Sequence, residues 1–271
     1  MAVTARPRPR AFACRHALAL LAALILWADV ASAEAGDASL VVAADRWCPY
    51  NCEPGSDRPG YLIDVLREVF EPLGIAVHYR VMPWKRALYE TERGRIDAAL
   101  GAVAGDRGNN IIGREPLGVN ETVLVVRRGQ ALEYWRPQDL TGLTIGVVAD
   151  YSYDSEGPLD SYLAKRRAAE AGVYVVRRQE PLASLLAMLT SDRIDVFPEN
   201  RYVVVHALSR LGYADDVKLL ETGVADSVYI AFTPDKRGRR HLELLDRGVR
   251  QLRASGRLRA IMARYGIHQD L

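Results

Sequence analysis

The stretch PWKRALYETERGRIDAAL, residues 83–100, is matched 98 residues later by PLASLLAMLTSDRIDVFP, residues 181–198. Each copy begins with proline, continues with helical spacing and reaches an Arg-Ile-Asp tripeptide ahead of a short apolar run. Proline suits the first helical position, because a helix leaves that N–H unbonded anyway. We therefore predict two related βαβ units, although any two such units share this pattern to some degree.

Strand and helix patterns alternate on both sides of the two copies. Residues 40–44, LVVAA, form a short apolar run typical of a buried parallel strand. Apolar residues then recur at helical spacing over 62–73 until Gly74, and an alternating strand covers 75–81. Residues 173–177 form the strand ahead of the second copy. The alternation predicts an α/β fold.

Two further strands, residues 120–127 and 226–232, lack the usual helix between them and their neighbours. Amphipathic helices follow the second of them, up to residue 265. We infer that the chain crosses to a second lobe, crosses back and ends on the first. The predicted lobes are residues 34–120 with the return 226–271, and residues 121–225. In open α/β sheets ligands bind beyond the carboxyl ends of the strands, so facing lobes would share one cleft.

The first 33 residues have the pattern of an export signal. A positive start is followed by an apolar run of eleven, residues 17–27, and by the small-x-small sequence of residues 31–33. The arginines of this start are Arg6, Arg8, Arg10 and Arg15. Eleven residues are well short of the roughly 20 that a membrane-spanning helix needs. We expect residues 1–33 to be a cleaved signal peptide, with Glu34 first in a periplasmic protein.

Charge gives no support for nucleic-acid binding. The chain has 36 basic and 34 acidic residues, and four Arg with Asp29 fall within residues 1–33, which leaves 32 basic and 33 acidic residues. The net charge of the mature chain is therefore close to −1 rather than +2. We expect no nucleic-acid partner.

Two of the three cysteines remain in the mature chain. Cys14 precedes the apolar run and leaves with the signal, whereas Cys48 and Cys52 stay. An even pair in an oxidising compartment indicates a disulfide that closes a short loop. A metal site is the alternative, but no His or third Cys lies nearby in the sequence.

Short motifs follow one another along the mature chain in a recognisable order. They are Asp45 at the end of a strand, Pro49-Tyr50, Gly60-Tyr61-x-x-Asp64, Pro83-Trp84, Gly94-Arg95-Ile96-Asp97-Ala98, Arg107 nine residues before Pro116, Asp139-Leu140-Thr141-Gly142, and Gly146-Val147-Val148. In this order they resemble the bacterial solute-binding proteins of the polar amino-acid ABC transporter type, the family 3 extracellular solute-binding proteins. The resemblance covers essentially the whole mature chain.

The resemblance implies a fold and a function. The fold is the two-lobed, periplasmic-binding-protein-like (type II) α/β fold, with the lobes joined by two crossing strands. The function is capture of a small polar, amino-acid-like or carboxylate solute and its delivery to the membrane permease of an ABC transporter. We expect a monomer that uses no cofactor and no metal.

The resemblance also implies an anchor for a solute carboxylate. In the family this role falls to the arginine that matches Arg107, because a guanidinium binds a carboxylate through two parallel hydrogen bonds. A solvated loop arginine is the alternative. Gly101 and Ala102 stand where the family usually has Ser or Thr, so only their backbone N–H groups could contact the solute.

Aromatic walls are the second implied feature. Trp47 matches the family's aromatic residue near the end of the first strand, after Asp45, and Trp84 matches its stacking position. A flat apolar face excludes water and strengthens polar contacts. Both tryptophans follow strand ends and are predicted to face the cleft, although core packing is the alternative for each. Asp45, at the end of the first strand, is also predicted to contact the solute.

The second lobe is expected to supply polar groups. Tyr151 and Ser152 lie between a strand and a helix, where N–H groups and a hydroxyl can bind an anionic group. The family commonly places an aspartate for the solute's ammonium five residues after the position of Asp195, where this chain has Asn200, preceded by Glu199. Glu199 could replace the aspartate only if its side chain turned toward the cleft.

Two other functions remain open from the sequence. Some proteins of this fold are dehydratases in which a cleft carboxylate is the general acid, and Glu199, Asp45 and Asp64 are the candidates here. The chain shows no nucleophile–base pair with family spacing and no Gly-rich phosphate loop. A soluble sensor that docks on a signalling receptor is the third possibility, and fold alone does not decide between these functions.

Overall fold

The computed structural model describes residues 1–2, 39–178 and 180–269. Ser39–Leu271 form one compact unit, separate from Met1–Ala38. The predicted signal peptide and Cys14 therefore lie outside the described residues, apart from the first two positions. None of the helices in the described part of the chain is long and apolar enough to cross a membrane.

The strands of the described chain form one mixed sheet of eight, in the order β2-β1-β3-β8-β4-β7-β5-β6. β1 pairs in parallel with β2 and β3, and β5 pairs in parallel with β6 and β7. The strands are β1 Ser39–Ala44, β2 Ala76–Val81, β3 Ala98–Ala102, β4 Gly118–Arg127, β5 Ile145–Val148, β6 Val173–Val176, β7 Val196–Asn200 and β8 Val217–Phe232.

Helices cover both faces of the sheet. The α-helices are α2 Tyr61–Phe70, α3 Trp84–Glu92, α4 Pro158–Ala168, α5 Pro181–Thr190, α6 Arg201–Leu211, α7 Lys236–Ala254 and α8 Arg257–Arg264, with short 3₁₀ turns at Glu71–Leu73, Ala104–Asp106 and Pro137–Leu140. Leu40 and Val42 of β1 pack in the core under α2, α7 and α8, whereas Ala43 packs under α3. Alternate side chains of β1 point to opposite faces of the sheet and thus pack in two different cores.

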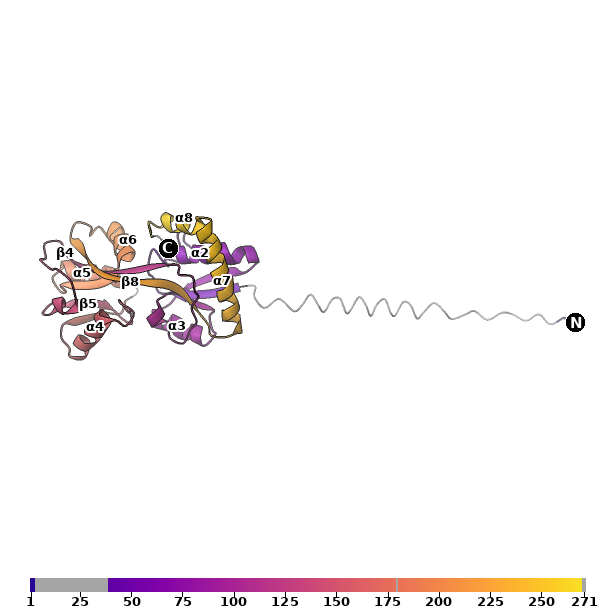
Figure 1. Ribbon diagram of the computed structural model, residues 1–271, viewed down its shortest axis with the longest axis horizontal. Helices are drawn as coiled ribbons and strands as arrows, with labels where there is room; N and C mark the ends of the chain where they lie inside the picture. The colour runs from indigo at the N-terminus through magenta and orange to yellow at the C-terminus, as the bar shows by residue number, and fades with distance from the viewer. Residues whose placement is uncertain (3–38, 179, 270–271) are drawn as a thin grey trace. The chain divides into compact units, whose positions relative to one another are not determined.

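Two strands, β4 and β8, join the halves of the sheet (Figure 1). They pair antiparallel from Gly118 to Arg127, β8 continues to β3, and β4 pairs on its other edge with β7. We call β1–β3 with α2, α3, α7 and α8 the first lobe, and β5–β7 with α4–α6 the second. The two-lobed α/β fold with two crossing strands is confirmed, and the residue boundaries given for the lobes stay a prediction.

The repeated Arg-Ile-Asp sequence has the same structural role in both lobes. The Asp97 carboxylate accepts a hydrogen bond from the N–H of Val41 at 2.7 Å, and that of Asp195 accepts one from Thr144 at 2.8 Å. Each aspartate therefore fastens its own segment to the start of the neighbouring strand. The strands begin only after these residues, at Ala98 and Val196, slightly later than the apolar runs suggested.

The two prolines differ by one position. Pro181 is the first residue of α5, as predicted, whereas Pro83 is the N-cap residue of α3, which begins at Trp84. Either position suits proline, because neither N–H has a partner within the helix.

Candidate functional site

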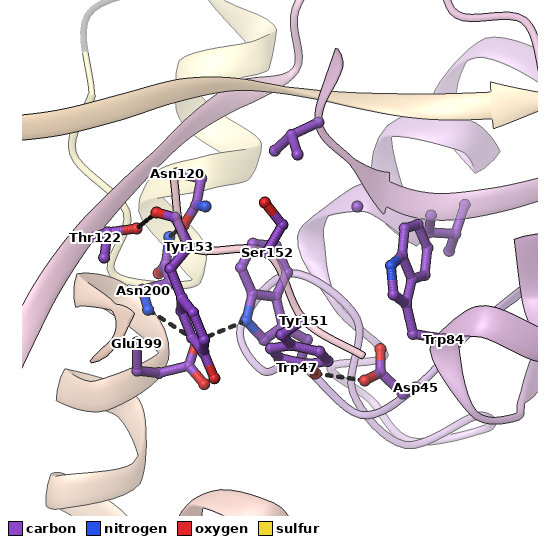
Figure 2. A pocket seen from close by; sticks show the side chains of 13 residues that line it. Asp45, Trp47, Trp84, Asn120, Thr122, Tyr151, Ser152, Tyr153, Glu199 and Asn200 are labelled. Atoms are coloured by element: carbon purple, nitrogen blue, oxygen red, sulfur yellow. Dashed lines mark hydrogen bonds between the residues drawn. The ribbon is translucent and has the colours of Figure 1, made fainter. Parts of the chain in front are cut away.

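A cavity lies between the lobes, where both sets of strand ends meet the crossing strand β4 (Figure 2). It contains about 530 Å³ of space, part of it open to solvent. Its lining residues are Asp45, Trp47, Trp84, Leu100, Gly101, Val103, Asn120, Thr122, Tyr151, Ser152, Tyr153, Glu199 and Asn200.

Eight of the ten ligand-binding residues predicted from the sequence line this cavity. The two that do not are Ala102, which is fully buried, and Arg107. The Arg107 guanidinium donates to the carbonyl oxygen of Asn110 at 2.5 Å, three residues along its own loop. The structure thus places the expected carboxylate anchor outside the lining, and its role stays a prediction.

Three polar lining residues were not predicted. Asn120 and Thr122 lie on β4, and Tyr153 lies two residues after the predicted Tyr151. Alternate residues of a strand share one face, so the spacing of Asn120 and Thr122 was a usable signal once β4 was placed at the cleft. The Thr122 hydroxyl donates to the carbonyl oxygen of Tyr153 at 2.6 Å and holds the second-lobe loop against β4.

Aromatic side chains form much of the cavity wall. The Trp47 ring stacks on Tyr50, with centroids 4.1 Å apart. Gly101 has a φ of +88°, and a Cβ at that position would sit 3.5 Å from the Trp47 ring. That distance is an ordinary contact, so glycine at this position serves the left-handed backbone rather than the space beside the indole. Trp84 and Tyr151 also line the cavity (Figure 2).

Asp45 and Glu199 supply the two carboxyl groups of the cavity. Burial raises the pKa of Asp45 to about 6, against a lowering effect of the hydrogen bond that it accepts from the Tyr151 hydroxyl. Burial raises the pKa of Glu199 to about 7, and the negative charge of Asp45 adds to that rise. Desolvation disfavours a carboxylate, so both groups titrate near neutral pH.

The side chain of Glu199 turns toward the cleft, as its predicted role required. Its Oε1 accepts the indole N–H of Trp47 at 3.1 Å and the backbone N–H of Asn200 at 2.8 Å. Its Oε2 has no hydrogen-bond partner among the described residues. The second oxygen is therefore available to a solute.

Asn200 is committed to protein contacts. Its Oδ1 caps α6 by accepting the N–H of Val203 at 3.1 Å. Its Nδ2 donates to the Tyr50 hydroxyl at 3.0 Å and to Oδ1 of Asn120 at 2.8 Å. Both ends of the amide are used, so Asn200 serves mainly to join α6, β4 and the first lobe.

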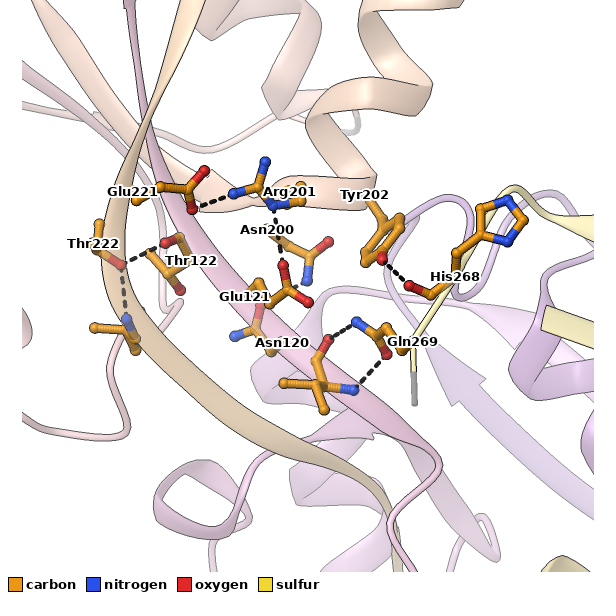
Figure 3. Close-up of polar contacts among 12 residues, drawn as sticks. Asn120, Glu121, Thr122, Asn200, Arg201, Tyr202, Glu221, Thr222, His268 and Gln269 are labelled. Atoms are coloured by element: carbon orange, nitrogen blue, oxygen red, sulfur yellow. Dashed lines mark hydrogen bonds and ion pairs between the residues drawn. The ribbon is translucent and has the colours of Figure 1, made fainter. Parts of the chain in front are cut away.

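Further contacts fix the crossing strands beside Asn200 (Figure 3). Arg201 pairs with Glu121 of β4 at 3.0 Å and with Glu221 of β8. Gln269 exchanges two hydrogen bonds with the backbone of Val119, at 2.7 and 2.8 Å. The C-terminal segment therefore lies along β4 at the level of the cavity.

Ser152 also has partners already. Its hydroxyl donates to Asp160 at 2.5 Å and accepts the backbone N–H of Glu156 at 3.3 Å. The predicted role of this hydroxyl in binding an anion would require it to leave Asp160.

The loop that carries Trp47 is closed by a disulfide. Cys48 and Cys52 are bonded, with Cα atoms 4.8 Å apart, as the sequence predicted. Both border a second cavity that shares Trp47, Tyr151 and Glu199 with the first. No group of three or more potential metal ligands occurs in the described part of the chain.

The third carboxylate considered for acid catalysis lies elsewhere. Asp64 accepts hydrogen bonds from the Tyr265 hydroxyl at 2.6 Å and from Arg264 at 2.7 Å, and it does not line the cavity. The arrangement joins α2 to the C-terminal end of α8 and is structural.

Solved structures share this fold over most of the chain. An ancestral arginine-binding protein bound to arginine is 18% identical with a TM-score of 0.69, over 84% of this chain and 98% of that one. The amino acid ABC transporter substrate-binding protein AbpA of Streptococcus pneumoniae, bound to L-arginine, is 16% identical with a TM-score of 0.66, over 84% and 94%. A histidine kinase sensor domain with similarity to periplasmic binding proteins is 20% identical with a TM-score of 0.69, over 84% and 95%.

The sequence gives the family directly. None of the curated protein sequences matches the chain. The model of the bacterial extracellular solute-binding proteins, family 3, matches residues 40–268, nearly all of the compact unit. This chain therefore belongs to the family 3 bacterial extracellular solute-binding proteins.

Proposed function

We propose that this chain captures a small polar solute between its lobes in the periplasm and delivers it to the membrane permease of an ABC transporter. The observation that carries the proposal is the composition of the cavity. Asp45, Trp47 and Trp84 come from the first lobe, and Tyr151 and Glu199 from the second. A solute that contacts both sets favours the closed state by its difference in affinity for the two states.

Solved structures of the same fold support a solute the size of an amino acid. The arginine-bound proteins of the same fold hold an amino acid. An amino-acid-like solute is therefore the starting class for this cavity. The predicted carboxylate anchor, Arg107, is outside the lining, so the proposal does not rest on a carboxylate.

Closure can be tested with the solute that the protein retains. Native mass spectrometry of protein purified from its own periplasm would weigh that solute. Small-angle scattering of protein stripped of solute, with and without it added back, should give a smaller radius of gyration in its presence. An unchanged profile at saturating solute would contradict capture by closure.

Sensing is a second candidate, favoured by the similarity to a histidine kinase sensor domain. The two roles differ in the membrane partner. Deletion of the gene should abolish uptake of the retained solute if the chain serves transport. Unchanged uptake, with loss of a transcriptional response to the same solute, would favour the sensor.

A further inference from the structure

The cavity is lined by acids but by no base. Of its lining residues in the described chain, the carboxyl groups are those of Asp45 and Glu199, and none is Lys, Arg or His. Glu199 is only 3% exposed. A buried carboxylate is costly unless it is paired with a positive charge.

No described residue supplies such a charge within ion-pair distance of these carboxyl groups. Neither Asp45 nor Glu199 forms an ion pair with any described residue, and their side-chain donors are the neutral Tyr151 and Trp47. Basic groups border the adjoining cavities instead. Asp45 itself also borders a cavity lined by Arg46, Lys85, Arg177 and Arg178, and Arg46 and Arg210 border another. Arg46 pairs with Glu53 at 2.5 Å and with Glu180 at 3.8 Å, and Arg210 pairs with Glu180 at 3.1 Å.

An anionic group would find little to bind it in this cavity. Arg107 donates to Asn110 outside the lining, and the Ser152 hydroxyl donates to Asp160. A solute carboxylate placed beside Asp45 and Glu199 would meet like charge at low dielectric, where repulsion is strong.

The aromatic lining favours a positive charge as well. Trp47, Trp84, Tyr151 and Tyr153 surround the carboxyl groups (Figure 2). The face of an aromatic ring carries partial negative charge and attracts ammonium and guanidinium groups, most strongly when water is excluded.

We infer that the solute is an organic cation whose ammonium or guanidinium group lies between Asp45 and Glu199, and that binding does not require a carboxylate on the solute. This inference rests on the proposed function, because it assumes that the cavity is the solute site. Charge compensation of Glu199 and Asp45 supplies the affinity, and the rings supply the fit.

The experiment compares each of four amino acids with the amine that lacks only its carboxylate. The pairs are arginine and agmatine, lysine and cadaverine, histidine and histamine, and tyrosine and tyramine. Calorimetry at pH 8 on protein stripped of solute should find at least one amine that binds within about tenfold of its parent amino acid or tighter. Amino acids that bind while their amines do not would overturn the inference and leave the proposed function intact.

Two variants tie the amine to this cavity. Glu199→Gln keeps the size and the hydrogen-bond acceptor but removes the charge, and it should weaken the amine by at least about tenfold. Asp45→Asn should do the same and serves if Glu199→Gln fails to fold. Glu243→Gln, at an exposed position on α7, is the matched control and should bind like the parent protein. An amine that binds to both cavity variants as tightly as to the parent protein would overturn the inference.

If no compound of the four pairs binds, the retained solute decides. A retained solute that carries a cationic group supports the inference if fragments of it without any anionic group still bind. A neutral or anionic retained solute overturns it. A protein that neither retains nor binds any solute contradicts the proposed function itself.

Discussion

The indole N–H of Trp47, in the first lobe, donates to the Glu199 carboxylate of the second lobe at 3.1 Å. The same oxygen accepts the N–H of Asn200. Two neutral donors therefore orient a buried carboxyl group without neutralising it. This combination of fixed geometry and unpaired charge at Glu199 underlies the first prediction.

Glu199→Gln should change how stability depends on pH. The pKa of Glu199 is raised from 4.5 to about 7 in the folded protein. Between these values the folded state holds a proton that the unfolded state has released, so stability is full below pH 4.5 and falls as pH rises toward 7. Glutamine does not titrate. Relative to the parent, the variant should therefore gain up to about 3 kcal/mol of unfolding free energy between pH 4.5 and 8.

Urea denaturation of solute-free protein at several pH values measures this gain, with Glu243→Gln as the control for replacing a glutamate. Parallel curves for Glu199→Gln and the parent would contradict it. Other charged or titratable groups border the two cavities and are present in both proteins. They are Asp45, Arg46, Glu53, Arg58, Tyr151, Tyr153, Glu180, His206 and Arg210.

Tyr151→Phe should raise the pKa of Asp45 further. Burial already raises that pKa to about 6, and the Tyr151 hydroxyl opposes the rise by donating to the carboxylate. Carbon-13 NMR titration of the aspartate carboxyl groups would report the change. Tyr153→Phe is the matched control, because the Tyr153 hydroxyl accepts the N–H of Val148 instead. A pKa of Asp45 that is unchanged or lower in Tyr151→Phe would refute this account.

Cys48 and Cys52 should carry no free thiol in protein purified from the periplasm. An oxidising compartment favours a disulfide between two cysteines held this close. Alkylation without reductant, followed by peptide mass mapping, should leave both unlabelled, and reduction under denaturing conditions should label both. Labelling before reduction would exclude the pairing.

Asp195→Asn should destabilise the second lobe. The carboxylate accepts the N–H of Thr144 at 2.8 Å and pairs with Arg127 at 2.8 Å. Loss of its charge should cost about 1–2 kcal/mol of unfolding free energy at pH 7. Asp215→Asn is the control, because Asp215 is fully exposed, 4.0 Å from Arg128, and its replacement should change stability by less than about 0.5 kcal/mol.

The effect of Asp195→Asn should fade in acid. Burial tends to raise the pKa of Asp195, but the bonds from Thr144 and Arg127 outweigh it and lower the pKa below 3.8. Its contribution is therefore present above pH 3.8 and is lost as pH falls through the folded pKa. A difference between variant and parent that stays constant down to pH 2 would rule out this role for the charge.

The repeat shows what sequence alone could predict. Arg-Ile-Asp at 95–97 and 193–195 marked equivalent points of the two lobes, because hydrophobic periodicity and the residues that begin or end helices and strands are local properties of the chain. That each aspartate would bond the start of a neighbouring strand depends on which strands pair. Which strands pair depends on contacts between segments far apart in the sequence, so this role was seen only in the structure.

The candidate site likewise has features that the sequence predicts and features that depend on distant contacts. Asp45, Trp47, Trp84 and Glu199 follow or end strands, and their place at the cleft followed from the topology rule for α/β sheets. Asn200 was expected to contact the solute and does line the cavity, but its amide is used by α6, Asn120 and Tyr50. Which polar atoms are already occupied depends on neighbours far along the chain, and spacing does not reveal them.

The ribbon of β4 and β8 carries an irregularity with a mechanical consequence. Thr122 pairs with Val224 and Val123 with Glu221, so Thr222 and Gly223 are extra on β8, and Gly223 has a φ of +75°. The Thr222 hydroxyl bonds across to the carbonyl of Thr122 (Figure 3). Bulges of this kind concentrate twist in an antiparallel pair. This bulge lies at the level of Thr122, which lines the cavity. We therefore expect the lobes to open by rotation about this part of the ribbon rather than by translation.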